Sequence, residues 1–527
     1  MLRLILSPSV GGTAGYLYDA VAALASSGGE AVLIVPEQYS FAAERIVLER
    51  LGTADAQRVE VLSFTRLANT VFNSVGWDKG KRLNEAGKIL LMSRALEQCA
   101  DKLTVYARSA DSPAVVRELL VLSEEFCQCA ISSEDIVSAM NNMEEGLLKD
   151  KLGDISLVFS VYDSFVSDGW LDDSRMLTRL KDKLAESGYF KNKTVFFDSF
   201  RGFTAQEFGI IGKILTQADD VCVALNAPDL TDVGSDDIFY HTKNTAKKLI
   251  KIAHSVDVPC AKPVTVNEPN SDAALDALAK DFLSPEADVF EGECGSIAVV
   301  AAPDIRSECA FIAAQIKKML RTGEYRSRDI AVIVRDDKSY IRPMMTALAK
   351  CGVPVFEDRR QPVINQPLMT LVRAALKIAD TGFDTDSVLR ALKTGLCPLE
   401  ADEVSDIENY TYLWQINGSG WLKKWESSPD GFGEMTESAS AELERLNALR
   451  EKAVEPFARF RSKLKNNDGE GCAKAVFELL SELDTAQRLK ELAIYLEDSG
   501  ESVLALETER LWDTLCSLLD VAAQTLG

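Results

Sequence analysis

The stretch Leu2–Ser26, LRLILSPSVGGTAGYLYDAVAALAS, decides the fold of the first part of the chain. Residues 2–6 are a short apolar run that predicts a buried strand, residues 7–12 form a turn that contains glycine, and residues 15–26 are rich in Ala and Leu and predict a helix. Further apolar runs follow at 31–36 (AVLIVP) and 59–64 (VEVLSF). Strands that alternate with helices predict an α/β fold on a parallel sheet.

The turn after the first strand has the position of a phosphate-binding loop but lacks its functional groups. Such a loop needs G-x-x-x-x-G-K-[ST], because the lysine neutralises phosphates and the hydroxyl holds Mg²⁺. Here Thr13 and Ala14 follow Gly12. We therefore predict a degenerate nucleotide site, and the alternative is an ordinary turn of a doubly wound sheet. Its loop residues are Ser7, Gly11, Gly12, Thr13 and Ala14.

The predicted secondary structure changes several times along the chain. Residues 84–184 form long amphipathic stretches that predict a helical insertion. Apolar runs that predict strands occur at 194–200 and 219–225, and again at 296–302, 329–335 and 352–357. A polar stretch at 229–293 predicts helix and loop, and everything beyond about residue 371 predicts helix. The expected organisation is a sheet framework with helical insertions.

Composition narrows the possible functions. With 58 Lys and Arg against 81 Asp and Glu, the net charge of -23 argues against a freestanding protein that coats DNA. No signal peptide or long apolar run is visible, which favours a cytoplasmic protein without a membrane span. The 11 cysteines form no C-x-x-C pair and only 2 histidines occur, so neither a zinc site nor histidine catalysis is indicated.

Two further positions bear on ATP chemistry. In an active P-loop motor, an apolar strand ends in Asp-Glu, where Asp holds the Mg²⁺ shell and Glu polarises the attacking water. The run FFDSFRGF at 196–203 keeps the aspartate as Asp198 but has Ser199 in place of the glutamate. Arg335, which ends the run DIAVIVR, holds the place of an arginine that reaches a γ-phosphate, although an arginine just after a strand is usually a solvated loop residue.

Polar and aromatic side chains follow the second and third predicted strands. Gln38 and Ser40 lie after VP at 35–36, and Phe64 and Arg66 lie after the third strand. Parallel sheets bind ligands at the carboxyl edge of their strands. Aromatic rings stack on bases and arginine grips phosphates or base edges, so this edge suits single-stranded nucleic acid. The alternatives are a plain loop and a helix start with a surface arginine.

The ordered blocks of the chain resemble the N-terminal half of the B subunit of AddAB-type ATP-dependent helicase-nucleases. The blocks are VPEQYSF (35–41), VLSFTRLA (61–68), LNEAGKILLMSRAL (83–96), VFFDSFRGFTAQEF (195–208), DIAVIVRDDKSY (329–340) and GVPVFEDRRQPVINQPLMTLVRAAL (352–376). The resemblance implies a UvrD-like superfamily 1 helicase fold, with RecA-like parallel sheets and large α-helical insertions. It implies a domain 1A with a degenerate P-loop at 1–80 and 185–295, an insertion 1B at 81–184, the first part of domain 2A at 296–385 and a truncated helical 2B-like region at 386–527.

The resemblance also implies roles for individual residues. Gln38 and Ser40 match a polar pair that contacts the DNA strand, and Phe64 and Arg66 match its aromatic and basic readers. Asn69 stands where relatives can have tryptophan, while Phe200 and Arg201 face the same path.

In this family the A subunit is the motor, and the B half is a scaffold that in many members inspects the single strand for the recombination hotspot Chi. We therefore expect a catalytically silent helicase-like module of a heterodimeric helicase-nuclease in double-strand break repair, without ATPase or nuclease activity in this segment. The expected partners are an AddA-like motor and nuclease subunit and single- and double-stranded DNA ends, with no membrane. No cofactor is expected in this segment, and Mg²⁺ and a 4Fe-4S cluster are expected beyond Gly527. The alternatives are an active ATP-driven DNA translocase and a purely structural partner without DNA contact.

Overall fold

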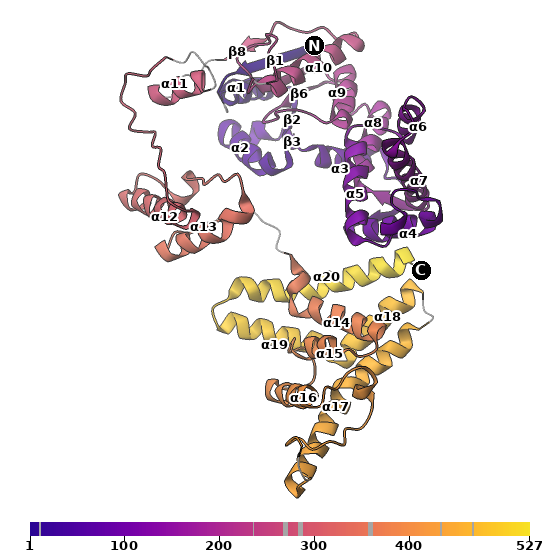
Figure 1. The fold of residues 1–527 in the computed structure, drawn as a ribbon. Coiled ribbons are helices and arrows are strands. Elements are labelled where there is room, and N and C mark those ends of the chain that lie inside the picture. Colours follow the sequence, from indigo (N-terminus) through magenta and orange to yellow (C-terminus); the bar gives the residue numbers. More distant parts are fainter. Residues whose placement is uncertain are drawn as a thin grey trace. The chain divides into compact units, whose positions relative to one another are not determined.

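The computed structural model describes residues 1–526 except 10–11, 236, 267–271, 283–287, 357–361, 433–434 and 466–467. The chain divides into two compact units, one of Met1–Asn267 with Val363–Gly527 and one of Glu268–Pro362. The first unit holds a six-stranded sheet, a helical insertion and a C-terminal block of helices (Figure 1). Each part is described separately below.

The six-stranded sheet is parallel throughout, with the order β3-β2-β6-β7-β1-β8. Its strands are β1 Leu2–Ser7, β2 Glu30–Ile34, β3 Val59–Leu62, β6 Lys193–Phe197, β7 Asp220–Asn226 and β8 Val264–Thr265. The first five were predicted as continuous apolar runs, as expected for parallel strands covered on both faces. Strand β8 lies in a stretch that was predicted to be helix and loop. The sheet is consistent with a RecA-like domain, and the UvrD-like assignment stays a prediction.

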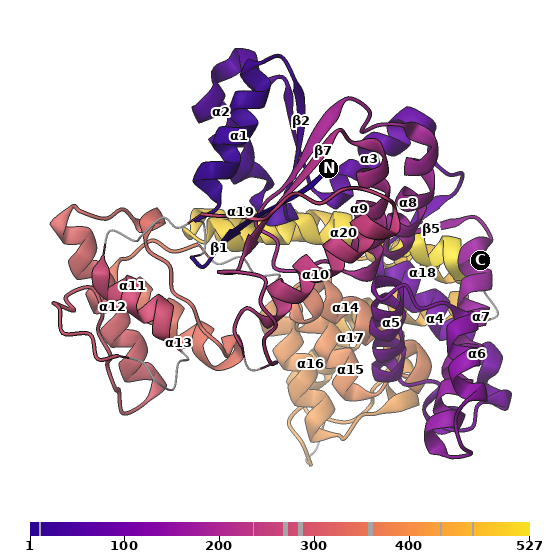
Figure 2. The same ribbon diagram turned by 90° about the horizontal axis from the view of Figure 1, so that it is seen from above.

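Helices cover both faces of this sheet (Figure 2). Successive strand residues point to opposite faces, so Leu33 packs under one helical layer and Ile34 under the other. One layer is α1 Ala14–Ser26 and α2 Ser40–Ala56. The other is α3 Phe64–Val75, α8 Met176–Ser187, α9 Ala205–Gln217 and α10 Tyr240–Ser255. Because α8 belongs to the core of the sheet, the insertion ends before it, earlier than the predicted residue 184.

The insertion contains α4 Glu85–Cys99, α5 Pro113–Gln128, α6 Ser133–Asn141 and α7 Leu147–Ser167. It is not all helical, since β4 Lys81–Leu83 and β5 Trp170–Asp172 pair in parallel at its two ends. Buried Asp154 of α7 accepts hydrogen bonds from the backbone N–H groups of Thr104, Val105 and Tyr106 at 2.7–3.1 Å. The carboxylate thus fixes the loop between α4 and α5.

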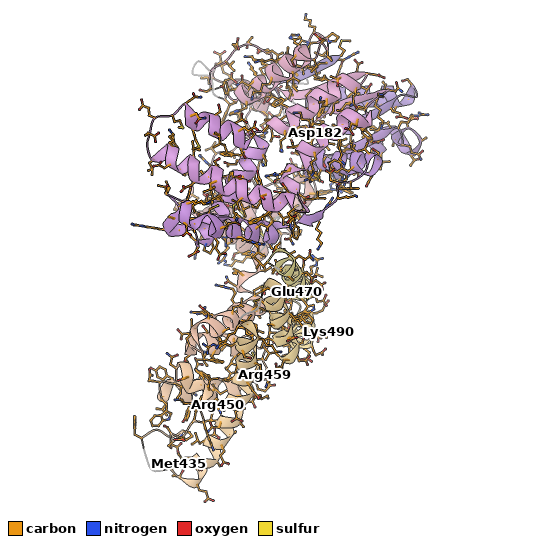
Figure 3. All side chains as sticks on the ribbon, turned by 90° about the vertical axis from the view of Figure 1, so that its right-hand side faces the viewer. Asp182, Met435, Arg450, Arg459, Glu470 and Lys490 are labelled. Carbon is orange, nitrogen blue, oxygen red and sulfur yellow. The ribbon has the colours of Figure 1, made fainter. Side chains whose placement is uncertain are left out.

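The C-terminal block of the first unit is helical, as predicted. Its helices are α14 Pro367–Thr381, α15 Thr385–Leu392, α16 Ala401–Leu413, α17 Glu437–Leu464, α18 Gly469–Glu482, α19 Thr485–Asp498 and α20 Ser502–Leu526. Figure 3 shows Arg450 and Arg459 along α17. Arg450 is buried and donates to the carbonyl oxygen of Trp421 at 2.9 Å, so a charged side chain ties the long helix to the aromatic core.

The second unit departs from the sequence prediction. It has the helices α11 Ala273–Asp281, α12 Ile305–Thr322 and α13 Asp337–Cys351. The predicted strands at 296–302 and 329–335, and the described part of 352–357, have no ladder partner among the residues described here. Apolar side chains on the first two segments are exposed, with Val299 at 96% and Ile333 at 94%, whereas Val353 on the third is buried. These segments match the composition of strands, but a strand forms only where a neighbouring backbone pairs with it.

Candidate functional site

The carboxyl edge of the six-stranded sheet brings together most of the predicted site residues. Strands β1, β2, β3 and β6 end at Ser7, Ile34, Leu62 and Phe197, and their loops leave on one side because the strands are parallel. The backbone N–H of Asp198 donates to the carbonyl of Ile34 at 3.1 Å, which ties the start of that loop to β2. This is the edge where α/β sheets bind ligands.

The turn between β1 and α1 is filled by its own side chains. The hydroxyl of buried Ser7 lies 3.2 Å from that of Ser9, and the N–H of Gly12 donates to the carbonyl of Ser9 at 3.1 Å. A Cβ at Gly12 would lie 2.3 Å from Ser7 Oγ. Thr13 is buried at the end of the turn, and Ala14 begins α1. Gly11, the remaining predicted loop residue, lies outside the described residues.

Asp198 occupies the end of β6 and is 8% exposed. Burial raises the pKa of its carboxyl, and hydrogen bonds from Ser199 and from the Tyr18 hydroxyl partly oppose this. The pKa of Tyr18 is also raised, mainly by burial and then by the charge of Asp198. The phenol therefore stays protonated and can donate a hydrogen bond. Ser199 is exposed and has a left-handed φ of 65°. A non-glycine residue in that conformation carries strain.

Tyr18 was not among the predicted site residues. The signal was present in the helix that follows the turn, where Leu17, Tyr18, Val21 and Ala25 are the buried positions of α1. Helical spacing therefore directs Tyr18 toward the sheet. The interaction of Tyr18 with Asp198 joins segments that are far apart in the sequence, so the local sequence pattern cannot predict it.

The loops after β2 and β3 carry the predicted DNA-contacting residues, and their exposure differs. Gln38 is exposed, whereas Ser40 is buried and its hydroxyl has no hydrogen-bond partner among the described residues. Arg66 Nη1 lies 2.6 Å from Glu44 Oε1 in a half-exposed ion pair with α2. Half-buried Asn69 has a side-chain oxygen without a described partner. Of these four side chains, Gln38 and Arg66 are the ones that reach solvent most freely.

Phe64 is only 6% exposed and belongs to the sheet core. Its ring packs against Phe197, Phe200 and Phe203, with centroid distances of 6.3, 5.8 and 6.4 Å. In this conformation its faces are covered, so the prediction that it stacks on a base needs revision. Phe200, half-buried at the same edge, packs on Phe203 at 4.8 Å and keeps part of its ring accessible.

The two remaining predicted residues are arginines in different units. Arg201 is exposed and has no ion pair within the described ranges, and its carbonyl accepts from the Thr245 hydroxyl at 3.5 Å. Arg335 is exposed in the second unit, at the end of the segment 329–335. The edge therefore unites Gln38, Arg66, Phe200 and Arg201, and Arg335 belongs to another part of the chain.

Two other kinds of feature are absent from the described residues. No three side chains of His, Cys, Asp or Glu are grouped there so as to hold a metal ion. None of the described helices combines the length and apolarity that crossing a membrane requires.

The fold and this edge define an α/β protein whose parallel sheet is consistent with the RecA-like class. The family model described as "ADDB, N-terminal" matches residues 4–279, more than half of the 527 residues, and the chain belongs to the AddB family. Its relatives include a Clostridium novyi protein that is 30% identical over 93% of this chain and 43% of its own length. A Clostridium acetobutylicum protein is 27% identical over 100% of this chain and 47% of its own length. Both are named as the B subunit of an ATP-dependent helicase/deoxyribonuclease, and this chain spans less than half of each.

Proposed function

We propose that this chain is the N-terminal half of the B subunit of an ATP-dependent helicase/deoxyribonuclease that processes DNA double-strand breaks for homologous recombination. The names of its relatives support that assignment. In this proposal an AddA-like partner hydrolyses ATP, and the present half scaffolds that motor without turning over nucleotide. Nuclease chemistry, Mg²⁺ and a 4Fe-4S cluster belong, on the same family resemblance, to the sequence that follows residue 527.

The observation that carries the silent role is the buried pair of Asp198 and Tyr18 beside a turn without lysine. A motor needs an ammonium on the phosphates, a free carboxylate for the Mg²⁺ shell and a base for water. Here Thr13 replaces the lysine, Ser199 replaces the base, and the Asp198 carboxylate already accepts from a phenol. In the described part of the turn, the hydroxyls of Ser7 and Ser9 lie beside Gly12. The groups present do not fit a Mg²⁺-nucleotide.

We further propose that the carboxyl edge touches the single strand that the motor delivers and, in the assembled complex, takes part in scanning for Chi. Gln38, Arg66 and Arg201 supply polar and cationic groups at the edge, and Phe200 supplies a partly accessible ring. Stacking on an aromatic ring contributes about 1–3 kcal/mol per base. Phe64 supports this surface from below by packing against Phe200.

Two measurements test the proposal. The purified chain is expected to hydrolyse no ATP with or without single-stranded DNA, and stimulated turnover would contradict it. In fluorescence anisotropy with a labelled single strand, Arg66→Ala combined with Arg201→Ala is expected to weaken binding. Arg45→Ala is the matched control, because Arg45 is an exposed arginine paired with Glu49 on α2.

A purely structural role without DNA contact is the second candidate. The ion pair of Arg66 with Glu44 and the burial of Phe64 favour it, since both engage residues that were expected to meet DNA. A reconstituted complex whose hotspot response survives Gln38→Ala, Arg66→Ala and Arg201→Ala together would favour this candidate over strand binding.

A further inference from the structure

The outer face of α9 carries cations that the site above does not use. Lys181 of α8 lies across Gly209, where a Cβ would be 3.2 Å from its Cδ and 3.7 Å from its Nζ. From the opposite side, Lys248 of α10 places its ammonium 5.6 Å from the ring centroid of Phe208. Two ammonium groups therefore lie over adjacent residues of one helix, and Lys213 follows one turn after Gly209. We call Lys181, Lys213 and Lys248 the α9 lysine cluster.

The cluster has no acidic partner within the described part of the chain, in contrast to neighbouring lysines. On the same helix α10, Lys243 pairs with Asp229 at 2.9 Å and Lys247 pairs with Asp232. Asp182, which Figure 3 labels on α8, follows Lys181 directly, and the two form no ion pair among the described residues. In a chain of net charge -23, three lysines that lie on or against one helix, without an ion pair among the described residues, favour contact with a polyanion.

The cluster continues the sheet edge. Helix α9 begins four residues after Arg201, and the Thr245 hydroxyl of α10 donates to the Arg201 carbonyl. Ile210, Ile211 and Ile214 of α9 face the sheet core. Lys181 and Lys248 are exposed, and Lys213 is half-buried. An ammonium is a compact point charge that binds phosphate without reading base edges.

We propose that the α9 lysine cluster holds the sugar-phosphate backbone of nucleic acid, as a sequence-independent contact beside the sheet edge. Its ammonium groups can bind the phosphates of a single strand and of a duplex alike. Binding neutralises three ammonium groups that have no acidic partner in the described part of the folded chain. This surface adds to the proposed DNA contact and can be separated from it by mutation.

The test is the salt dependence of DNA binding by the chain carrying Lys181→Gln, Lys213→Gln and Lys248→Gln. If all three lysines contact phosphates, the slope of log K against log salt becomes shallower by about 2.7 for duplex and about 2.1 for a single strand. The two DNA arms, each of scrambled sequence, show which form uses the cluster. A triple Lys→Arg variant keeps the charges and is expected to keep the slope.

The matched control removes three lysines that already have acidic partners: Lys149→Gln, Lys247→Gln and Lys393→Gln. It changes the net charge equally, and its slope is expected to stay near that of the unmodified chain. An unchanged slope in the cluster variant with both DNA forms overturns the proposal, as does an equal change in the control. An effect of Arg66→Ala with Arg201→Ala alone supports only the sheet edge, and an effect of the cluster alone supports only this inference.

Discussion

The side chains of Tyr18 and Asp198 interact inside the sheet domain, where burial and the Asp198 carboxyl together raise the pKa of the Tyr18 phenol. The interaction links helix α1 to the end of β6. Both side chains are less than 10% exposed, at 3% and 8%. A neutral phenol thus interacts with the Asp198 carboxyl. In an active motor, the aspartate at this position would instead hold the Mg²⁺ shell. Burial raises the pKa of the Asp198 carboxyl, the contact with Tyr18 partly opposes this, and the shift makes the stability of the fold depend on pH.

Asp198→Asn is expected to change that pH dependence. Burial raises the pKa of the Asp198 carboxyl, so the folded chain binds this proton more tightly than the unfolded chain does. The free energy of unfolding therefore falls as pH rises from the ordinary carboxyl pKa, about 4, through the raised value. Asparagine cannot ionise, so the Tm of Asp198→Asn minus that of the unmodified chain should increase from pH 4 to pH 7. Thermal melts that give a pH-independent difference would contradict this.

Tyr18→Phe is expected to act in the opposite direction. Loss of the phenol removes a hydrogen bond that lowers the Asp198 pKa, and leaves a buried carboxylate with fewer donors. We expect a loss of about 1–2 kcal/mol at pH 7 and a smaller loss at pH 4, where more of the carboxyl is protonated. Urea unfolding in a double-mutant cycle with Asp198→Asn measures the coupling. Additive effects of the two substitutions would mean that the pair does not interact.

The burial of Phe64 was not predicted, although the local pattern indicates it. Its place after a strand suggested an edge residue, but Phe64, Leu67, Ala68, Val71 and Phe72 have helical spacing and all are buried on α3. The hydroxyl of Ser63 accepts from the backbone N–H of Arg66 and caps the helix, so Phe64 turns inward as its first residue. By contrast, five strands of the first sheet were predictable because each is a continuous apolar run.

In the second unit, the local sequence pattern was not sufficient to predict which segments form strands. The runs at 296–302 and 329–335 have the β-branched composition of strands, yet Val299 and Ile333 are exposed and unpaired within the described chain. Strand propensity reports how well a side chain fits a pleated surface, and the hydrogen-bonding partner must come from elsewhere. The pairing of Arg66 with Glu44, across two helices, is hidden from sequence for the same reason.

Glu44→Gln is expected to strengthen single-strand binding at the sheet edge. The Glu44 carboxylate lies 2.6 Å from the Arg66 guanidinium and neutralises it, and both side chains are more than two-fifths exposed, at 42% and 45%. Half-exposed ion pairs contribute about 0.2–1 kcal/mol, so freeing Arg66 should raise affinity by a factor of about 1.4 to 5. Fluorescence anisotropy measures this. Glu49→Gln, which breaks the pair with Arg45 on the same helix, is the control and should change affinity less. Equal gains in both variants would assign the effect to net charge alone.

Lys88→Met is expected to destabilise the insertion strongly. The Lys88 ammonium is nearly buried, 2.8 Å from Glu124 and 3.4 Å from Asp172. Burial alone would lower the pKa of Lys88, but these carboxylates and Glu85 hold it above its ordinary value. Removing the ammonium leaves Asp172 as a buried carboxylate without its cation, which costs about 3–5 kcal/mol.

Two further variants decide whether the buried charge is the cause. Asp172→Asn added to Lys88→Met should restore part of the lost stability in urea unfolding, because it removes the uncompensated charge. Lys149→Met breaks the exposed pair with Glu145 and should cost less than about 1 kcal/mol. If the double variant is as unstable as Lys88→Met, the loss comes from the packing of the lysine stem. A recovery instead identifies the buried charges as what ties α4 and α5 to the end of β5.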